Sequence, residues 1–252
     1  MKSLVSRVAG KMTKLFVRDT ARYRGINLPA KHLRFCGIEF KDDEFFLVSA
    51  MKEADRLAEN FGLTADTRLL DVGCGVGRLP IGILNQIGEI RHYRGVDVSQ
   101  RSIRWCRRHI ARKHPSFQFV HLDVYNPRYN PSGRPIDVDF RLPFIDHEFD
   151  IIYAYSVFSH MTEKDVQAYL KEFRRLLSPA GKMFLTAFIE EGVPNMTINP
   201  EGYGLRWTGP LHCVRYNRDF FEGLLKESGF ILDYFEYATE TDDQSGLYIS
   251  RG

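Results

Sequence analysis

Apolar and polar positions alternate along this chain in a pattern that predicts strands and helices in turn. Apolar runs predict strands at 68–72, 93–98, 117–122, 151–157, 182–188, 230–237 and 247–250. Apolar residues at helical spacing predict helices over 44–61, 79–87, 100–113, 163–177 and 219–228. Strands that alternate with helices indicate βαβ units. The pattern therefore predicts an α/β fold with a Rossmann-like, doubly wound sheet that is mostly parallel.

The end of the chain departs from this alternation. The last two predicted strands are joined only by the polar loop 239–246. Because so short a connection makes a hairpin, the last strand is predicted to run antiparallel to its neighbours. The segment of about 190–218 also breaks the pattern, since it is rich in glycine, proline and aromatic residues. Long loops inside compact domains are usually functional, so this segment is predicted to be a lid or substrate-binding insertion.

The first 60 residues are predicted to form a helical extension in front of a domain at 61–252. Apolar residues recur at helical spacing near the start of the chain, at Leu4, Val8, Met12, Leu15 and Phe16. Basic residues occupy the opposite side, so the extension is predicted to act as a lid or a docking segment. The net charge of +3 hides a charge of +8 on the first 34 residues and six basic residues within 100–113. These residues allow contact with RNA or anionic lipid, and solvated helix faces are the plainer interpretation.

Composition excludes several classes of protein. With 44% hydrophobic and 27% charged residues, the 252-residue chain is typical of a globular domain. Its longest apolar run, near residues 151–158, is far shorter than the roughly 20 residues that cross a bilayer. The four cysteines lie far apart and have no histidine at metal-ligand spacing. We therefore expect no metal, no disulfide framework and a reducing, cytoplasmic location.

A glycine-rich motif follows the first strand of the predicted sheet. It reads Asp71-Val-Gly73-Cys-Gly75-Val-Gly77 and directly precedes a predicted helix. Glycines let a ligand approach the backbone, and a helix N-terminus offers free N–H groups to an anion. A dinucleotide fingerprint would need glycine or alanine where Arg78 stands, which disfavours a nicotinamide cofactor. A tight turn without a ligand is the alternative.

Acidic residues end the first three predicted strands. Asp97 comes at the end of the second strand and Asp123 at the end of the third. Ligands of open α/β sheets bind outside the carboxyl ends of the strands, so Asp71, Asp97 and Asp123 are predicted to converge on one crevice. Asp97 is placed to accept the two hydroxyls of a ribose. A helix cap would explain any one of these acids but not three in consecutive strands.

Together with the segment from Phe149 to His160, these motifs resemble the class I S-adenosylmethionine-dependent methyltransferases. The resemblance covers about residues 69–188, and it implies S-adenosylmethionine as the cofactor. It implies that the three glycines lie behind the methionine portion and that Asp97 binds the ribose. Asp123 and the amide of Val124 would meet the adenine, and Val98 and Tyr155 would lie beside the cofactor. Shorter motifs are similar to bacterial methyltransferases near genes for surface-sugar assembly.

Methyl transfer mainly requires that the acceptor be aligned with the methyl group, and a hydroxyl acceptor benefits from a nearby base. His160 follows the fourth predicted strand and is the candidate catalytic residue, with capping of the next helix as its alternative role. In the insertion, Tyr203, Trp207 and His212 are candidates for binding the substrate, and simple packing is their alternative role. No Pro-Pro-aromatic turn follows the fourth strand, which disfavours methylation of a base amine.

The favoured function is O-methylation of a small-molecule or sugar-containing acceptor. An RNA or protein methyltransferase that uses the basic helices is one alternative, and a non-catalytic S-adenosylmethionine-binding module is another. Peripheral membrane contact through residues 1–24 also stays open, and the sequence does not indicate an oligomeric state.

Overall fold

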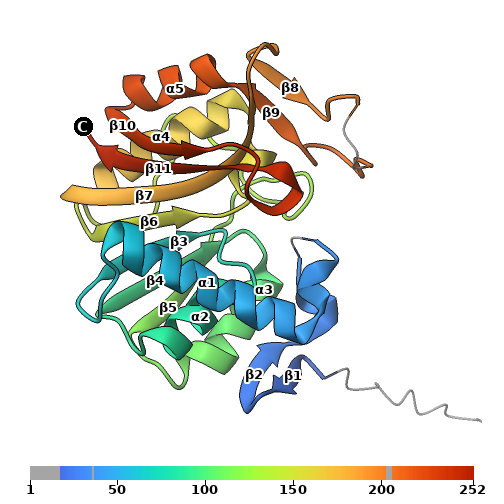
Figure 1. Cartoon of the computed structure of the whole chain (residues 1–252), viewed down its shortest axis with the longest axis vertical. Coiled ribbons are helices and arrows are strands. Elements are labelled where there is room, and N and C mark those ends of the chain that lie inside the picture. Colours follow the sequence, from blue (N-terminus) through green and yellow to red (C-terminus); the bar gives the residue numbers. More distant parts are fainter. Residues whose placement is uncertain (1–17, 36, 203–205) are drawn as a thin grey trace, which may run out of the picture.

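The computed structural model describes residues 18–35, 37–202 and 206–252. Its centre is a mixed sheet with the strand order β10-β11-β7-β6-β3-β4-β5 (Figure 1). The strands are β3 (Arg68–Val72), β4 (His92–Asp97), β5 (Phe117–His121), β6 (Phe149–Ala154), β7 (Leu177–Glu190), β10 (Phe230–Glu236) and β11 (Ser245–Arg251). Strands β3 to β7 are parallel, and β11 runs antiparallel to both β7 and β10. The predicted fold class and the predicted antiparallel last strand are confirmed.

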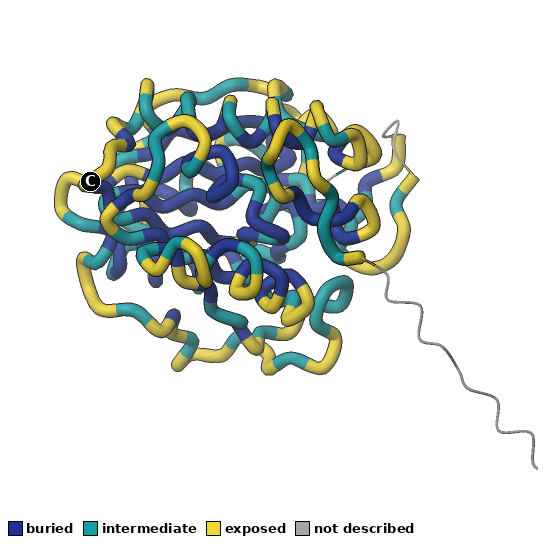
Figure 2. Tube along the Cα trace, turned by 90° about the horizontal axis from the view of Figure 1, so that it is seen from below, coloured by how far each residue is buried: buried dark blue, intermediate teal, exposed yellow. Residues whose placement is uncertain are grey.

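Helices cover both faces of the sheet. One core contains α1 (Asp43–Phe61), α2 (Arg78–Gln86) and α3 (Gln100–Cys106), and the other contains α4 (Glu163–Leu176) and α5 (Arg218–Glu227). Alternate residues of β3 enter different cores, with Leu69 on the α1 side and Leu70 on the α4 side. This period of two is what buries a central strand on both faces. Buried backbone accordingly fills the middle of the molecule in Figure 2.

Local sequence explains where the helices begin. The Asp42 carboxylate accepts a hydrogen bond from the Phe45 N–H at the start of α1, and Asn217 does the same for Phe220 at the start of α5. Thr162 and Asp165 form a capping box in front of α4. The predicted helix at 100–113 is different in detail, because α3 ends at Cys106 and a π-helical turn, Arg107–Ala111, continues it.

The described part of the predicted helical extension is not all helical. Residues Thr20–Tyr23 (β1) and Ile26–Pro29 (β2) form an antiparallel hairpin, whose turn has positive φ at Arg24 and Gly25. Short 3-10 turns follow at Lys31–Leu33 and Glu39–Lys41. The prediction of a helical extension is wrong for these residues. Two strands of four residues each are too short to show a recognisable alternation of apolar and polar positions. The predicted amphipathic helix at 4–16 lies outside the described residues.

Helix α1 is a layer of the main domain and not a separate extension. It packs closely on α2, since a Cβ added to Gly82 would lie 1.9 Å from the Ala50 carbonyl oxygen. The insertion also joins the sheet, because β8 (Met196–Ile198) pairs antiparallel with β9 (Val214–Asn217), and β9 pairs parallel with β7. Within the described residues, no helix combines the length and the apolar character that crossing a bilayer requires.

Candidate active site

The glycine loop between β3 and α2 is shaped by three left-handed residues. Gly73, Gly75 and Gly77 have φ values of +73°, +51° and +80°. A Cβ at Gly73 would lie 2.4 Å from a methyl carbon of Val157, and one at Gly77 would lie 2.6 Å from Ile110. At Gly75 the nearest atom would be the Gly73 carbonyl oxygen, 4.0 Å away. The outer two glycines are therefore required for packing, whereas the middle one leaves open space above the loop.

Asp97 joins this loop to the end of β4. Its carboxylate accepts hydrogen bonds from the backbone N–H of Gly75 at 2.8 Å and of Ser99 at 2.6 Å. Burial raises the pKa of Asp97, and these two hydrogen bonds oppose the shift. The Leu122 N–H donates to the Asp97 carbonyl oxygen at 3.0 Å, and the adjacent Val98 carbonyl oxygen lies 3.0 Å from the His121 ring. Asp97 and Val98 thus lie between the glycine loop and the chain that follows β5.

Asp71 lies near the end of β3, just before the glycine loop. Its side chain is buried under the loop, 2% exposed, and accepts a hydrogen bond from the Tyr93 hydroxyl. Burial raises the pKa of Asp71 to about 7. The alternation of β3 accounts for its place, because Asp71 points to the same side of the sheet as Leu69. The convergence of Asp71, Asp97 and Asp123 on one crevice stays a prediction.

Asp123 and Val124 lie where the chain leaves β5. The exposed Asp123 carboxylate is 3.3 Å from the Arg134 guanidinium, and the Asn130 side-chain amide donates to the Val124 carbonyl oxygen at 3.0 Å. The Val124–Arg134 bridge folds this segment back on itself. Asp123 therefore lies just beyond the carboxyl end of β5, beside the end of β4 where Asp97 pairs with His121.

His160 lies over the carboxyl end of β6, in the 3-10 turn Phe158–His160. Its Nδ1 is 3.0 Å from the Leu211 carbonyl oxygen, and its ring meets the Tyr129 ring edge-on at 5.6 Å. Burial lowers the pKa of His160 to about 4, so the ring is neutral at pH 7. Because a carbonyl oxygen only accepts, the proton lies on Nδ1 and the lone pair on Nε2. His160 does not cap α4, whose capping box is complete without it.

Two candidate substrate residues of the insertion lie next to His160. The Trp207 ring is 5.4 Å from the His212 ring and 6.2 Å from that of Phe188. His212 Nδ1 accepts a hydrogen bond from the Thr208 N–H at 2.6 Å, and burial lowers its pKa. Tyr203, the third candidate, lies outside the described residues.

Arg128 connects the insertion to the loop after β5. Its guanidinium donates to the Thr208 carbonyl oxygen at 2.7 Å and to the Tyr129 hydroxyl at 3.2 Å. Neither Arg128 nor Tyr129 was predicted as a site residue. The structure thus brings His160, Trp207 and His212 together around this loop.

Tyr155 lies in a different environment, among buried charges. Its hydroxyl is 2.8 Å from the Thr241 hydroxyl, and the Arg78 guanidinium lies 4.5 Å from the centre of its ring. Burial raises the pKa of Tyr155 to about 12. Nearby, Arg56 forms a 2.7 Å ion pair with Glu240. Tyr155 therefore helps to attach α2 to the segment before β11.

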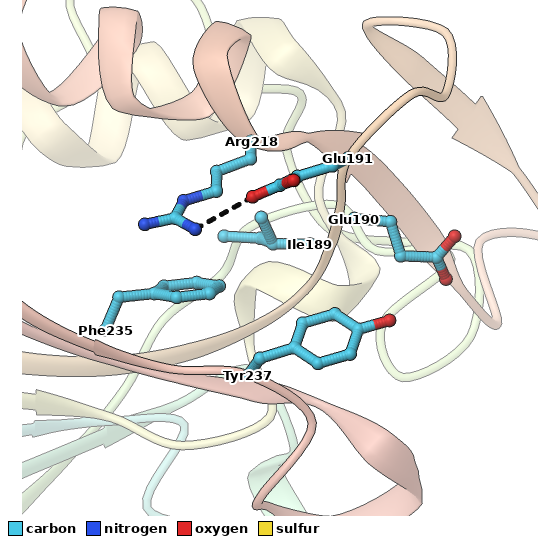
Figure 3. A pocket seen from close by; sticks show the side chains of 6 residues that line it. All are labelled: Ile189, Glu190, Glu191, Arg218, Phe235 and Tyr237. Carbon is cyan, nitrogen blue, oxygen red and sulfur yellow. Dashed lines mark hydrogen bonds and ion pairs between the residues drawn. The ribbon is translucent and has the colours of Figure 1, made fainter.

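A hollow of about 550 Å³ lies apart from these residues, at the ends of β7 and β10 (Figure 3). Arg218 crosses it, with its guanidinium 2.9 Å from the Glu191 carboxylate and 4.4 Å from the centre of the Phe235 ring. Tyr237 stands exposed at its edge. Among the residues that the structure describes, none of those predicted as site residues lines this hollow.

Comparison with known proteins matches one region of the chain to a family. Residues 70–183 match the family described as "Methyltransferase domain". An uncharacterized protein of Haemophilus influenzae is 24% identical over 71% of this chain and 64% of its own length. The methyltransferase GfsG of Streptomyces halstedii is 26% identical over 55% of this chain and 44% of its own length. The O-methyltransferase rstn1 of Aspergillus nomiae is 25% identical over 76% of this chain and 75% of its own.

Solved structures share the fold. One is the 1,6-didemethyltoxoflavin-N1-methyltransferase of Burkholderia thailandensis, solved with S-adenosylhomocysteine. It is 17% identical to this chain and superposes with a TM-score of 0.53, and the match covers 83% of this chain and 80% of the solved chain. The [4+2]-cyclase SpnF gives a TM-score of 0.54 at 19% identity and covers 80% of both chains. The chain spans less than two thirds of the length of the first two curated relatives above. The family match, the strand order and the glycine loop agree, and residues 70–183 form a methyltransferase domain of the class I, S-adenosylmethionine-dependent kind.

Proposed function

We propose that this protein transfers the methyl group of S-adenosylmethionine to a hydroxyl of a small molecule. One observation carries the proposal: the Gly75 N–H donates a hydrogen bond to the Asp97 carboxylate at the end of β4, and the space beside Gly75 is open. His160 lies close to the glycine loop, since Val157 packs against Gly73 and its carbonyl oxygen accepts a hydrogen bond from the His160 N–H. A donor site and an acceptor site would therefore be neighbours.

The residues present fit the cofactor. When bound, S-adenosylmethionine supplies a methyl group on a positively charged sulfur. The open side of Gly75 would admit its methionine portion close to the backbone, as a side chain there would not. The Asp97 oxygens already accept two N–H groups and keep further lone pairs for ribose hydroxyls. Asp123 and Val124, beyond the end of β5, are proposed to face the adenine.

His160 is proposed to orient the acceptor. With its proton fixed on Nδ1 by the Leu211 carbonyl oxygen, the Nε2 lone pair would accept a hydrogen bond from an acceptor hydroxyl. A pKa near 4 makes His160 a weak base, so alignment is favoured over full removal of the proton before transfer. The rings of Trp207 and His212 contact each other, and together they would line one side of the acceptor site with a mostly apolar surface.

The cofactor part of the proposal is tested by titration calorimetry with S-adenosylhomocysteine. Asp97→Ala should weaken binding by about 1–3 kcal/mol, because it removes hydrogen bonds to a charged acceptor. Asp66→Ala, an exposed acid remote from the loop, is the control. Unchanged affinity in Asp97→Ala, or no binding by the unaltered protein, would refute the proposed site.

The acceptor part is tested with labelled S-adenosylmethionine and fractionated pools of small molecules, including sugar-containing ones. Product should form with a hydroxylated small molecule, and its mass should identify the methylated atom. Cofactor binding without product from any pool would favour a module that binds without turnover. The cyclase that shares the fold is a reminder that this architecture alone does not specify methyl transfer.

A further inference from the structure

The loop after β5 holds Arg128 in a defined position beside the candidate acceptor site. The Asn126 side-chain oxygen accepts hydrogen bonds from the backbone N–H groups of Arg128 and Tyr129, both at 3.0 Å. The backbones of Asn126 and Asn130 hydrogen-bond to each other in both directions, at 3.1 and 2.9 Å. The other end of the side chain is held by the insertion, because the guanidinium donates to the Thr208 carbonyl oxygen at 2.7 Å. Arg128 is therefore positioned before any ligand binds.

Arg128 carries a positive charge that no acidic residue neutralises. Its contacts with Thr208 and the Tyr129 hydroxyl use two of the five N–H groups of a guanidinium. Among the residues that the structure describes, no carboxylate forms an ion pair with Arg128, and the remaining residues of the chain include no acid. The other N–H groups and the charge are thus available to a ligand.

The histidines near Arg128 leave this charge unopposed. Burial is the main reason that the pKa values of His160 and His212 are lowered, and the positive charge of Arg128 lowers both further. The two rings are therefore close enough to be influenced by the guanidinium, and both are neutral at pH 7. A positive potential without a fixed counter-ion attracts a negatively charged group.

Arg128 and His160 lie against the same aromatic ring. The centre of the Tyr129 ring is 5.6 Å from the centre of the His160 ring and 5.6 Å from the central carbon of the Arg128 guanidinium. One small molecule is long enough to reach both groups. Its hydroxyl would donate a hydrogen bond to Nε2 of His160, and an anionic group elsewhere on it would accept from Arg128.

We propose that the acceptor is a hydroxylated small molecule with a carboxylate or phosphate group, and that Arg128 binds this group. The inference rests on the proposed function, because it describes the substrate that His160 would orient. A guanidinium presents its N–H groups in a planar fork that matches two oxygens of a carboxylate or phosphate. A neutral acceptor would leave the charge of Arg128 unpaired, so this residue would select anionic acceptors over neutral ones.

The anion site is tested first without methyl transfer. The chain has two tryptophans, so Trp105→Phe leaves Trp207, which precedes Thr208, as the remaining one. In that background, inorganic phosphate or acetate, titrated at constant ionic strength, should change the fluorescence of Trp207 until it saturates. The anion that binds more tightly identifies the kind of anionic group. No saturable change with either anion would overturn the proposal.

Matched variants locate the charge in the same assay. Arg128→Gln should weaken binding of the anion by about tenfold or more, because hydrogen bonds between charged groups are the stronger kind. Arg128→Lys keeps the charge and should retain part of the affinity. Arg141→Gln removes an equal charge from an exposed residue that pairs with Asp146, and it should bind normally. Equal losses in Arg128→Gln and Arg141→Gln would refute a specific site. A loss in Arg128→Lys as large as in Arg128→Gln would refute binding through charge.

Methyl transfer then tests the acceptor itself. Anion-exchange chromatography divides the small-molecule pools into a retained, anionic fraction and an unretained one. Labelled S-adenosylmethionine should give product from the retained fraction, and Arg128→Gln should raise the KM for that acceptor by about tenfold or more. An unchanged KM, or product from the unretained fraction alone, would overturn this inference and leave the proposed function intact. Binding of the anion that depends on Arg128, without product from any fraction, would support the anion site and refute the proposed function.

Discussion

The geometry of the glycine loop makes a prediction that separates ligand binding from folding stability. Gly75 and Gly62 both have left-handed backbone conformations, with φ values of +51° and +71°, and an added Cβ would meet no atom closer than 4.0 Å at either position. Alanine should therefore cost the same backbone strain at each, roughly 1–2 kcal/mol of unfolding free energy. Only at Gly75 would the new methyl group enter the space above the cofactor loop.

The expected difference appears in affinity. A methyl group in a site that must admit a ligand costs about 1–3 kcal/mol, which raises the Kd for S-adenosylhomocysteine about 5- to 150-fold. Gly75→Ala should show that loss in titration calorimetry, and Gly62→Ala should bind normally. Urea unfolding of both variants should give similar losses of stability.

Gly73→Ala provides a further comparison, because its Cβ would lie 2.4 Å from a methyl carbon of Val157. That variant should lose more stability than either of the others. If Gly75→Ala binds as tightly as the unaltered protein, the open side of the loop is not the ligand site. If Gly62→Ala loses affinity equally, the effect on binding arises from stability alone. Either result would refute the reasoning.

Three further predictions concern buried polar groups. Tyr93→Phe should cost about 1–3 kcal/mol of unfolding free energy in urea, because Asp71 would lose its hydroxyl partner while staying buried. Glu240→Gln should cost about 1–3 kcal/mol in the same assay, since Arg56 would keep only its longer pair with Glu53. Because the folded pKa of His160 lies below its unfolded value, the folded protein resists protonation there, and stability should rise with pH from about 4 to 6.5 relative to His160→Gln. A difference between these two proteins that does not change with pH would contradict the lowered pKa.

The sheet could be predicted from sequence because its strands are short and the helices between them have one apolar face. Strands β3 and β6 are mostly apolar and buried, whereas β4 and β5 place less buried polar residues between buried ones. The hairpin Thr20–Pro29 was missed because its strands have four residues each and carry little periodicity. The π turn at Arg107–Ala111 was also not predicted; its Ile110 side chain lies against Gly77, a contact that no local pattern records.

The candidate site was predictable only in part, for a related reason. The order of the strands predicted that Asp97 and Asp123 lie at neighbouring strand ends. The alternation of side chains along β3 directs Asp71 into the core, where its carboxylate accepts a hydrogen bond from the Tyr93 hydroxyl. Arg128 and Tyr129 belong to the site through contacts with the insertion, eighty residues away along the chain. Contacts of that kind depend on the tertiary packing of two loops, which the periodicity of apolar residues does not indicate.

The close packing of α1 on α2 determines where this chain can be shortened. Ala50 and Gly82 approach so closely that no side chain fits between them, and Glu53 of α1 accepts a 2.9 Å hydrogen bond from the Tyr153 hydroxyl on β6. A protein that began at residue 61 would expose the apolar side of α2 and leave Tyr153 without this partner. The smallest unit that can fold on its own therefore begins no later than the Asp42 cap, and the family match at 70–183 is shorter than that unit.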